Sequence, residues 1–400
     1  MAPSAQSHQA ELLIAAVRAF LNPAELDALA GLTRTFHHWD GLVAEADWHH
    51  VSPILWRVLE TLPSGPIPDN ILHQLRALNT KNSFRNLVLL GELRRLSEVF
   101  EANRIPIAAF KGPVLAVANY GDLGLRRFSD LDILVSPDHV WRARDLLAAE
   151  GYRLYSNVDW CGEDLYLRRH PALVMTRGVA AVDLQWRPFG DFVPYRFDLP
   201  ALWDRRGTVV IAGRPVPVFS AEHHLLFLAA HGAKHHWARL GWVCDLARFL
   251  QTTSVDWPRA FALAKPAGNP LVLAHALALV RDFAGVAIPP EAEQWIHASR
   301  RLAADSREIE SGMARRILGA GRDPTLIEKL RLYRKLSSGL LGPLRILNTL
   351  AQPTEREWKI LHLPPALYPL YYPFRFLRVL AMYGFLLTKH GLRQLLVRNR

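Results

Sequence analysis

Cysteine is scarce in this chain, whose 400 residues contain only Cys161 and Cys244. Two separated cysteines exclude the disulfide framework of a small secreted domain, and they also exclude a CxxC-type metal site. The N-terminal residues lack the basic start and the small-residue cleavage site of a signal peptide. These absences predict a protein of a reducing, cytoplasmic compartment.

Long apolar runs, internal repeats and low-complexity segments are missing as well. The uninterrupted apolar stretch near the C-terminus, residues 379–388, is about half of the ~20 residues that span a bilayer. We therefore expect no transmembrane helix. With 50% hydrophobic and 21% charged residues the composition is globular, which excludes a disordered or fibrous chain, and the length predicts two or three domains.

Hydrophobic spacing divides the chain into helical and mixed segments. Asn22-Pro23 is a typical helix start, and residues 71–103 form one long amphipathic stretch. Prolines concentrate in residues 188–219, where we expect linkers. The predicted regions are a helical N-terminal region (1–100), a small α/β core (101–219), a helical domain that completes a cleft (220–330), and a basic, aromatic-rich helical tail (331–400).

Three segments of the predicted core have the pattern of strands. IPIAAF (105–110) is a short apolar run, and FSDLDILVSP (128–137) alternates with a period of two residues. LVMTRGVAAVDLQW (173–186) has the pattern of two strands joined near Arg177-Gly178. Helical spacing over 138–150 separates these strands, so the sequence predicts an α+β fold with a small mixed sheet.

Two aspartates lie two residues apart on the second of these strands. Residues i and i+2 of a strand project to the same face, so Asp130 and Asp132 point together while Leu131 and Ile133 face the core. Carboxylates that close repel each other unless a cation lies between them, and Mg²⁺ is a natural partner. Asp183 would be the third carboxylate if its strand lies beside theirs. The alternative is that the two aspartates cap an exposed strand end and that Asp183 makes a surface hydrogen bond.

Positive charge flanks the aspartates. Lys111-Gly112 follows a strand and opens a helix, where backbone N–H groups and a lysine can receive phosphate. Arg126 and Arg127 lie just before the aspartates and could neutralise a polyphosphate. The order strand, KG turn, helix, arginines, DxD strand, helix and a further Asp-bearing strand is a compound signal.

With these motifs the chain resembles the DNA polymerase β-like nucleotidyltransferase superfamily, and more closely the bacterial nucleotidyltransferase family proteins with a KG-type turn. The matching segments are FKGPVLAVANYGD, LRRFSDLDILV, VDLQW, HGAKHHWARLGWVCDLARFL and, more weakly, LHLPPALYPLYYPFRFLR. The resemblance spans roughly residues 40 to 380. It implies a polymerase β-like core with a helical second domain.

The resemblance also implies roles for individual residues. Asp130 and Asp132 match the metal-binding aspartates, Asp183 the third carboxylate, which can help to activate an acceptor hydroxyl, and Gly112 the glycine of the signature turn. The implied cofactor is Mg²⁺ or Mn²⁺, as two ions. The predicted nucleotide- or phosphate-binding residues are Lys111, Gly112, Arg126, Arg127 and Ser129.

The chain departs from the superfamily pattern at the turn, where Gly112 is followed by Pro113 instead of glycine or serine. Proline has neither an N–H nor a hydroxyl group, so one common contact to a triphosphate is missing. The segment between Gly112 and Asp130 is also longer than usual. These departures open a second donor class: a nucleoside triphosphate is the leading expectation, and an NDP-sugar or another pyrophosphate-bearing donor on the same metal site is the alternative.

A histidine-rich segment, residues 223–250, is predicted to be helical. His231 and His235 are four residues apart and share a helix face, but no HExxH motif or third ligand indicates zinc. One interpretation is a polar face that lines the substrate cleft, and the other is a helix packed on the core, with its histidines bonded to the backbone or to Asp245. The residues predicted to line the cleft are His231, Lys234, His235, Arg239 and Asp245.

The net charge of +11 is concentrated at the C-terminal end. Residues 331–400 contain twelve Lys or Arg and two Glu residues, so the remaining 330 residues are close to neutral. Such a tail predicts an anionic partner, while a solvated helical face is the simple alternative. For the aromatic stretch 361–388, three interpretations stay open: an interfacial membrane segment, a terminal element packed on the protein body, or a nucleic-acid-binding element.

The leading hypothesis is a metal-dependent transferase that moves a nucleoside monophosphate from an NTP to a hydroxyl or phosphate of an acceptor. Glycosyl transfer from an NDP-sugar and a catalytically silent nucleotide-binding module are the alternatives. The acceptor, whether peptide, small molecule or RNA, is not determined by the sequence. Peripheral membrane contact through the tail is a further hypothesis.

Overall fold

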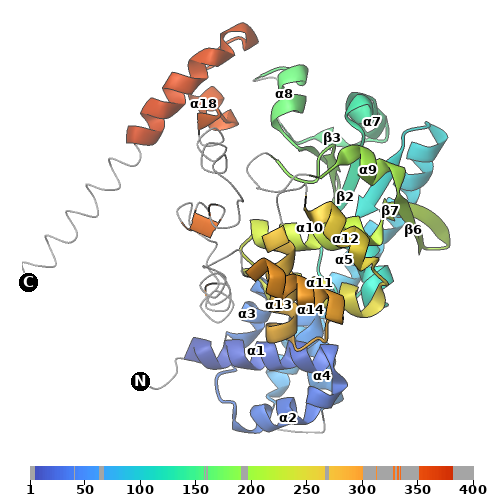
Figure 1. Ribbon diagram of the computed structural model, residues 1–400, viewed down its shortest axis with the longest axis vertical. Coiled ribbons are helices and arrows are strands. Elements are labelled where there is room, and N and C mark those ends of the chain that lie inside the picture. The colour runs from blue at the N-terminus through green and yellow to red at the C-terminus, as the bar shows by residue number, and fades with distance from the viewer. Residues whose placement is uncertain are drawn as a thin grey trace, which may run out of the picture.

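The computed structural model describes most of residues 5–300, together with residues 351–381. Within the first range it leaves out residues 40, 63–66, 157, 159–160, 191–196 and 266–269, and between the two ranges it describes residues 312, 328, 331, 332 and 334. The chain forms a mixed sheet flanked by helices, and this confirms the predicted α+β class (Figure 1).

Within the described residues, seven strands form a mixed sheet in the order β3-β4-β5-β2-β1-β7-β6. The strands are β1 (Ile107–Phe110), β2 (Leu131–Val135), β3 (Arg153–Leu154), β4 (Ala172–Arg177), β5 (Ala180–Gln185), β6 (Arg206–Ile211) and β7 (Arg214–Phe219). β2 pairs antiparallel with β1 and parallel with β5, so the three strands that carry the sequence motifs are neighbours at the centre of the sheet.

Helices precede, interrupt and follow the sheet. Before it are α1 (Ala5–Leu21), η1 (Pro23–Glu25), α2 (Leu26–Thr35), α3 (Leu42–Trp48), α4 (Ser52–Thr61) and α5 (Asp69–Ala102). Between the strands are α6 (Gly112–Leu115), the π-helical turn η2 (Ala116–Tyr120), η3 (Pro137–His139), α7 (Val140–Ala149), α8 (Glu163–Arg169) and α9 (Leu199–Asp204). After it are α10 (Ala221–Lys234), α11 (Leu240–Thr252), α12 (Trp257–Ala264), α13 (Pro270–Ala284), α14 (Pro290–Arg300), α18 (Glu355–Ile360) and η4 (Pro365–Leu370).

The two faces of the sheet belong to two hydrophobic cores. On β1, Ala108 and Phe110 pack into a core built mainly from α1–α4 and α10–α14, while Ile107 and Ala109 pack into a second core with the C-terminal half of α5 and with α7. Alternation along the strand produces this division, since neighbouring side chains point to opposite faces. The N-terminal helices and the helices that follow Ser220 therefore share one core, in which α1 contacts α11 and α13 (Figure 1).

Several local predictions are confirmed. Asn22 caps η1 with its side chain, Ser220 caps α10, and one helix, α5, covers the amphipathic stretch that begins near residue 71. The expectation of linkers across 188–219 is wrong for its second half, which forms the hairpin β6–β7 of the sheet. Pro215 and Pro217 lie in β7, where β1 pairs at Val218. β1 pairs with β7 at Val218 and not at the prolines, so the N–H groups that Pro215 and Pro217 lack are not needed for pairing with β1.

The described part of the C-terminal region packs on the sheet domain. Tyr371 is fully buried and Tyr368 nearly so, and both lie in the core that contains α5 and α7. Glu357, also fully buried, accepts hydrogen bonds from Arg375 and Arg378. None of the helices in the described residues combines the length and the apolar character that a membrane crossing requires.

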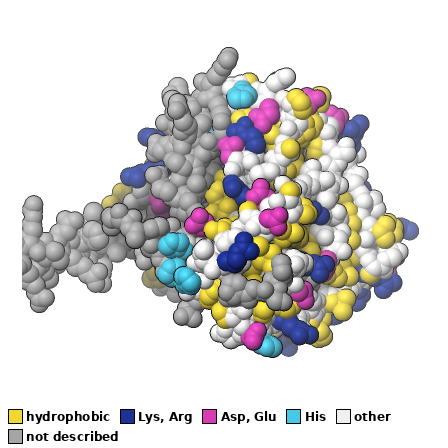
Figure 2. Space-filling model, turned by 90° about the horizontal axis from the view of Figure 1, so that it is seen from below, with side chains coloured by type: hydrophobic (Ala, Val, Ile, Leu, Met, Phe, Trp, Pro, Cys, Tyr) yellow, Lys and Arg dark blue, Asp and Glu magenta, His cyan; other side chains and the backbone are white. Residues whose placement is uncertain are grey.

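Charge on the protein body is mixed. Figure 2 shows one face of the molecule, on which Lys and Arg side chains alternate with Asp and Glu and with apolar side chains instead of gathering into a basic surface. This pattern agrees with the near-neutral charge of the first 330 residues.

Candidate active site

The three predicted carboxylates lie on adjacent central strands. In the parallel pair β2–β5, Asp132 is the register partner of Asp183, and in the antiparallel pair β1–β2 it faces Phe110. Asp130 precedes β2 and, by the two-residue period, belongs to the same face as Asp132. We call Asp130, Asp132 and Asp183 the acidic cluster. It lies on the face that α10 covers, because Phe110 and Leu134 of that face pack with α10.

Two side chains bridge the acidic cluster. The Lys111 Nζ atom lies 2.7 Å from Asp132 Oδ1. Gln185, which follows Asp183 by two residues on β5, donates from Nε2 to Asp132 Oδ1 at 2.9 Å and to Asp183 Oδ2 at 3.0 Å. One ammonium and one amide therefore hold the carboxylates in place, and the cluster retains two more negative than positive charges.

This imbalance raises the proton affinity of the cluster. Burial raises the pKa of Asp132 to about 7, and repulsion from Asp130 and Asp183 adds to that effect while Lys111 opposes it. Burial also raises the pKa of Asp183. Burial acts against the charged form of Lys111, but the surrounding carboxylates outweigh it and raise the pKa of that ammonium. Strongly shifted groups in a cleft are typical of functional sites.

The turn after β1 presents Lys111 to the cluster through an unusual backbone. Lys111 has φ 56° and Gly112 has φ 38°, both in the left-handed region. A Cβ atom on residue 112 would lie 3.2 Å from the carbonyl oxygen of Asp130, so this position needs glycine for its conformation and for its close approach to the strand. Pro113 lies in the first turn of α6 and contributes no N–H group there.

Arg126 lies in an ion pair behind the turn. Its Nε and Nη2 atoms donate to the two oxygens of Asp245 on α11, each at 2.8 Å, and Tyr120 donates its hydroxyl to Asp245 Oδ1 at 2.8 Å. Arg126 Nη1 also donates to the carbonyl of Gly112 at 3.3 Å. We call Arg126, Asp245 and Tyr120 the paired cluster. It joins the helical region to the KG turn, and Asp245 thus contacts Arg126 and Tyr120 instead of the histidines considered for it.

Arg127 and Ser129 lie at the mouth of the site. Arg127 forms an ion pair with the Asp47 carboxylate and donates to the carbonyl of the same residue at 2.7 Å. Ser129 is exposed beside Asp130. Among the cations predicted to meet phosphate, Lys111, Arg126 and Arg127 thus each contact a carboxylate of the protein itself.

The histidine-rich segment faces the site through α10 and the residues after it. The His231 ring stacks on Phe227 with centroids 5.6 Å apart, and His235 lies 4.8 Å from both His231 and Trp242. Burial, reinforced by nearby Lys111, lowers the pKa of His231 well below its usual range, so this ring is neutral at pH 7. Lys234 interacts electrostatically with Asp183. The contacts combine aspects of both interpretations, since the helix packs on the core and also supplies charge to the site.

Arg239 connects this segment with the N-terminal helices. Its guanidinium carbon lies 5.2 Å from the ring centre of Trp48 and 5.5 Å from that of Trp242, and Nη1 contacts His50 Nε2. Burial and the charge of Arg239 lower the pKa of His50 to about 3. Arg239 therefore packs the segment that follows α10 against the N-terminal region.

Several side chains around this site were not predicted from the sequence. They are Gln185, Tyr120, Asp47, His50, Lys81 and Arg85. Gln185 could have been identified from its two-residue spacing to Asp183, the same signal that joins Asp130 with Asp132. The residues of α3–α5 give no comparable signal, because only tertiary packing brings them to the strands.

The acidic cluster fits a hard cation in the type and number of its donors, since it offers three carboxylates with an excess of negative charge. In the described part of the chain, however, no three His, Cys, Asp or Glu side chains are already arranged as a metal-binding group. The Lys111 ammonium supplies the positive charge at Asp132. The residues thus suit a cation chemically, while their present contacts are to lysine and glutamine.

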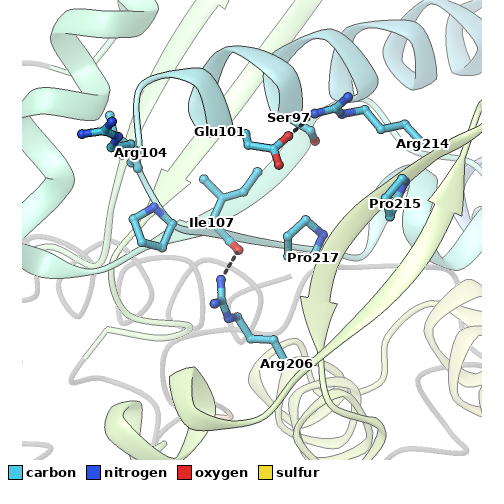
Figure 3. A pocket seen from close by; sticks show the side chains of 10 residues that line it. Ser97, Glu101, Arg104, Ile107, Arg206, Arg214, Pro215 and Pro217 are labelled. Atoms are coloured by element: carbon cyan, nitrogen blue, oxygen red, sulfur yellow. Dashed lines mark hydrogen bonds and ion pairs between the residues drawn. The ribbon is translucent and has the colours of Figure 1, made fainter.

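A cavity with a volume of about 360 Å³ lies at the end of β1 that is opposite to Lys111 (Figure 3). Its walls include Ile107, Pro217 and three arginines, of which Arg214 pairs with Glu101 and Arg206 donates to the carbonyl of Ile107 at 3.2 Å. Since Ile107 begins the strand that ends before Lys111, this cavity is separate from the acidic cluster.

A known protein family matches the part of the chain that contains these site residues. Residues 37–285, more than half of the chain, match the model of a family described as "uncharacterised nucleotidyltransferase". No curated protein sequence is significantly similar to the chain.

Two solved structures resemble parts of it. The solution structure of the antibiotic-resistance factor ANT(2'')-Ia is 14% identical and covers 56% of this chain and 97% of its own, with a TM-score of 0.29. The crystal structure of an antigenic nucleotidyltransferase-like protein from Paracoccidioides brasiliensis is 17% identical and covers 55% and 92%, with a TM-score of 0.30. Both TM-scores are low, so the match over residues 37–285 is the comparison that carries weight.

Proposed function

The chain belongs to the uncharacterised nucleotidyltransferase family, and we propose that it transfers a nucleoside monophosphate from an NTP to a hydroxyl or phosphate group of an acceptor. The single observation that supports this activity best is the register of β2 and β5, which aligns Asp132 with Asp183 next to Asp130. In the proposed reaction an acceptor oxygen attacks the α-phosphorus, the bond from this phosphorus to the bridging oxygen breaks, and pyrophosphate leaves.

We propose that the acidic cluster holds Mg²⁺ or Mn²⁺, as two ions, through Asp130, Asp132 and Asp183. When bound, such ions would neutralise donor phosphates and stabilise the charge that develops during an in-line displacement. The raised pKa values of Asp132 and Asp183 support this proposal, because burial, together with repulsion between the carboxylates, disfavours their charged forms and a cation would offset both effects.

The protein's own groups account for the remaining chemistry. Asp183, whose pKa is raised, or a water molecule next to it would take the proton of an acceptor hydroxyl. Lys111 would offset charge at the phosphates, and Gln185 would keep Asp132 and Asp183 aligned. Lys234, which interacts electrostatically with Asp183, would add positive charge for an anionic substrate.

Glycosyl transfer from an NDP-sugar is the second candidate, and Pro113 is the observation that favours it. An NDP-sugar has one phosphate fewer than an NTP and does not need the N–H contact that proline removes. A catalytically silent nucleotide-binding module is the third candidate, with the same proline as its support. The mass added to the acceptor separates the two reactions, because a nucleoside monophosphate and a hexose differ in mass.

Thermal unfolding with each donor tests these proposals before an acceptor is known. A ligand at ~100 times its Kd stabilises the native state by about 2.7 kcal/mol, which gives a readable shift. We expect stabilisation by one donor class that requires Mg²⁺ and is lost in the double variant Asp130→Ala/Asp132→Ala. Stabilisation by a donor without later turnover on any acceptor would favour the silent module, and no stabilisation by any NTP or NDP-sugar would contradict the proposed donor classes.

We also propose that the C-terminal tail contacts an anionic surface from a cytoplasmic position. Phe376, Leu377 and Leu380 are each more than half exposed although they are apolar. Arg375 and Arg378 pair with Glu357, so the other basic residues of the tail would supply the charge for this contact. The wild type should float with vesicles that contain phosphatidylserine, and Phe376→Asp should not. Val210→Asp, which changes an equally exposed apolar residue on β6, is the control, and equal flotation of all three proteins would contradict the proposal.

A further inference from the structure

A small cavity beside the acidic cluster is lined by cations from a helix that precedes the sheet. Its volume is about 130 Å³, and its polar lining consists of Asp47, Ser52, Lys81, Asn82, Arg85 and Arg127. We call it the α5 pocket, since half of these residues belong to α5. Pockets for whole drug-sized ligands measure about 300–1,000 Å³, so this one suits a single group of a larger ligand.

The α5 pocket contains more positive than negative charge. Lys81, Arg85 and Arg127 face one carboxylate, Asp47, which already pairs with Arg127. Within the described residues neither Lys81 nor Arg85 forms an ion pair with a carboxylate. Burial and repulsion from Arg127 lower the pKa of Arg85. An anion bound between these cations would relieve both effects.

Arg85 is also held rigidly with donor capacity to spare. Its Nη2 atom donates to Asn82 Oδ1 at 2.9 Å, and Asn82 is fixed in turn by donating to the carbonyls of Gly124 and Arg126 at 2.9 and 3.2 Å. The Arg85 Nε atom is buried and has no acceptor among the described residues. A buried N–H group without an acceptor costs free energy, and a ligand oxygen would supply the missing partner.

The position of the pocket identifies the ligand group. Arg127 lies three residues before Asp130, and Arg85 interacts electrostatically with Asp130 itself. At the KG turn, Pro113 offers no N–H group, Lys111 pairs with Asp132, and Arg126 pairs with Asp245. Lys81 and Arg85 of the α5 pocket thus add positive charge near Asp130 that no carboxylate of the described residues pairs with.

We propose that the α5 pocket binds a phosphate group of the donor nucleotide, with Arg85 as its principal ligand and Lys81 and Arg127 as supporting charges. This inference rests on the proposed nucleotidyl transfer and adds a phosphate site to it. Arginine suits this role because its guanidinium can donate two parallel hydrogen bonds to phosphate oxygens.

The test compares Arg85→Met and Lys81→Met with Arg76→Met, a matched loss of charge at an exposed position of the same helix outside the pocket. Calorimetry would measure binding of inorganic pyrophosphate, of an NTP and of the corresponding nucleoside. We expect Arg85→Met to weaken pyrophosphate and NTP binding by at least about tenfold and nucleoside binding by less than twofold, with a smaller loss for Lys81→Met and none for Arg76→Met. Arg85→Lys, which keeps the charge, should recover part of the affinity.

The outcomes separate this inference from the proposed function. If the wild type binds an NTP and all variants bind it equally well, the α5 pocket is not a phosphate site, although nucleotidyl transfer still stands. If Arg85→Met loses pyrophosphate but the wild type binds no NTP, the pocket takes free phosphate or a phosphorylated acceptor, and the donor assignment is wrong. If Arg85→Met does not fold, Lys81→Met and Arg85→Lys decide by the same criteria.

Discussion

The paired cluster and the acidic cluster both contain carboxylates beside a cation, but their charges balance differently. In the paired cluster, one carboxylate, Asp245, accepts two hydrogen bonds from Arg126 and a third from Tyr120. In the acidic cluster, Lys111 serves three carboxylates. The paired cluster therefore satisfies its own charges, while the acidic cluster leaves negative charge for a proton or a cation to neutralise.

The two balances have different physical consequences. A buried ion pair with all its hydrogen bonds made is costly to break, because removal of one partner leaves an unpaired charge in a medium of low dielectric constant. In the acidic cluster that cost is already present in the folded state: burial, with repulsion from Asp130 and Asp183 added to it, raises the pKa of Asp132 to about 7. The same substitution, aspartate to asparagine, should thus act in opposite directions in the two clusters.

The largest expected effect is on catalysis at the acidic cluster. Asp132→Asn keeps the shape of the side chain and removes its charge, so we expect the turnover number to fall on the order of 10³-fold or more, provided that the proposed nucleotidyl transfer holds. The measurement is pyrophosphate release under saturating donor. Asp138→Asn, at an exposed aspartate just after the same strand, is the control and should retain full activity. Full activity of Asp132→Asn would remove Asp132 from the reaction.

The next effect is on folding at the paired cluster. Asp245→Asn leaves the Arg126 guanidinium buried without its counter-charge, and such changes cost about 3–5 kcal/mol of unfolding free energy. Denaturation in urea would measure the loss. Turnover per folded molecule should fall far less than in Asp132→Asn, because Asp245 supports the KG turn only through Arg126. An unfolding free energy equal to that of the wild type would show that the pair contributes no stability.

The third effect is an opposite change of stability at Asp132, measured in metal-free buffer. A carboxyl group whose folded pKa is about 7 binds its proton more tightly in the folded than in the unfolded state. Its ionisation therefore does not lower the unfolding free energy near pH 4. The loss of unfolding free energy grows as the pH rises toward 7 and stays constant above that. Asp132→Asn should therefore match the wild type near pH 4. At pH 8 it should exceed the wild type by on the order of 2–4 kcal/mol.

The urea midpoints of both proteins across this pH range provide the comparison. A variant that is less stable than the wild type at pH 8 would mean that the contact with Lys111 outweighs burial and repulsion at Asp132. The acidic cluster would then resemble the paired cluster in its energetics, and the contrast between them would fail.

The strands of the acidic cluster could be predicted from the sequence, but their pairing could not. Alternation around Asp130 and Asp132 is a local property, and it predicted the strand that forms β2. The alignment of Asp183 with Asp132 depends on which strands become neighbours, and contacts between segments about fifty residues apart set that register. From the sequence, the convergence of the carboxylates could therefore be predicted only on the condition that the two strands are neighbours.

The paired cluster shows the other limit. Arg126 and Asp245 are separated by more than a hundred residues, and neither position has a local signal that distinguishes a structural ion pair from a phosphate ligand. Both were predicted to meet substrate, because an arginine before a DxD motif and an aspartate on a cleft helix suit that role. Their pairing follows from how α11 packs against η2, a long-range contact that the hydrophobic pattern does not specify.

The smallest expected effect concerns the third member of the paired cluster. Tyr120→Phe removes one hydroxyl donor to Asp245 but leaves both hydrogen bonds from Arg126, so the ion pair keeps its counter-charge. A single hydrogen bond to a charged group contributes about 1.5–3 kcal/mol, and we expect a loss near the lower end because Arg126 still satisfies both carboxylate oxygens. Urea denaturation of Tyr120→Phe, Asp245→Asn and the double variant would measure the coupling. If the double variant is no less stable than Asp245→Asn alone, the hydroxyl acts only through Asp245, whereas additive losses would show that Tyr120 contributes to the fold independently of the ion pair.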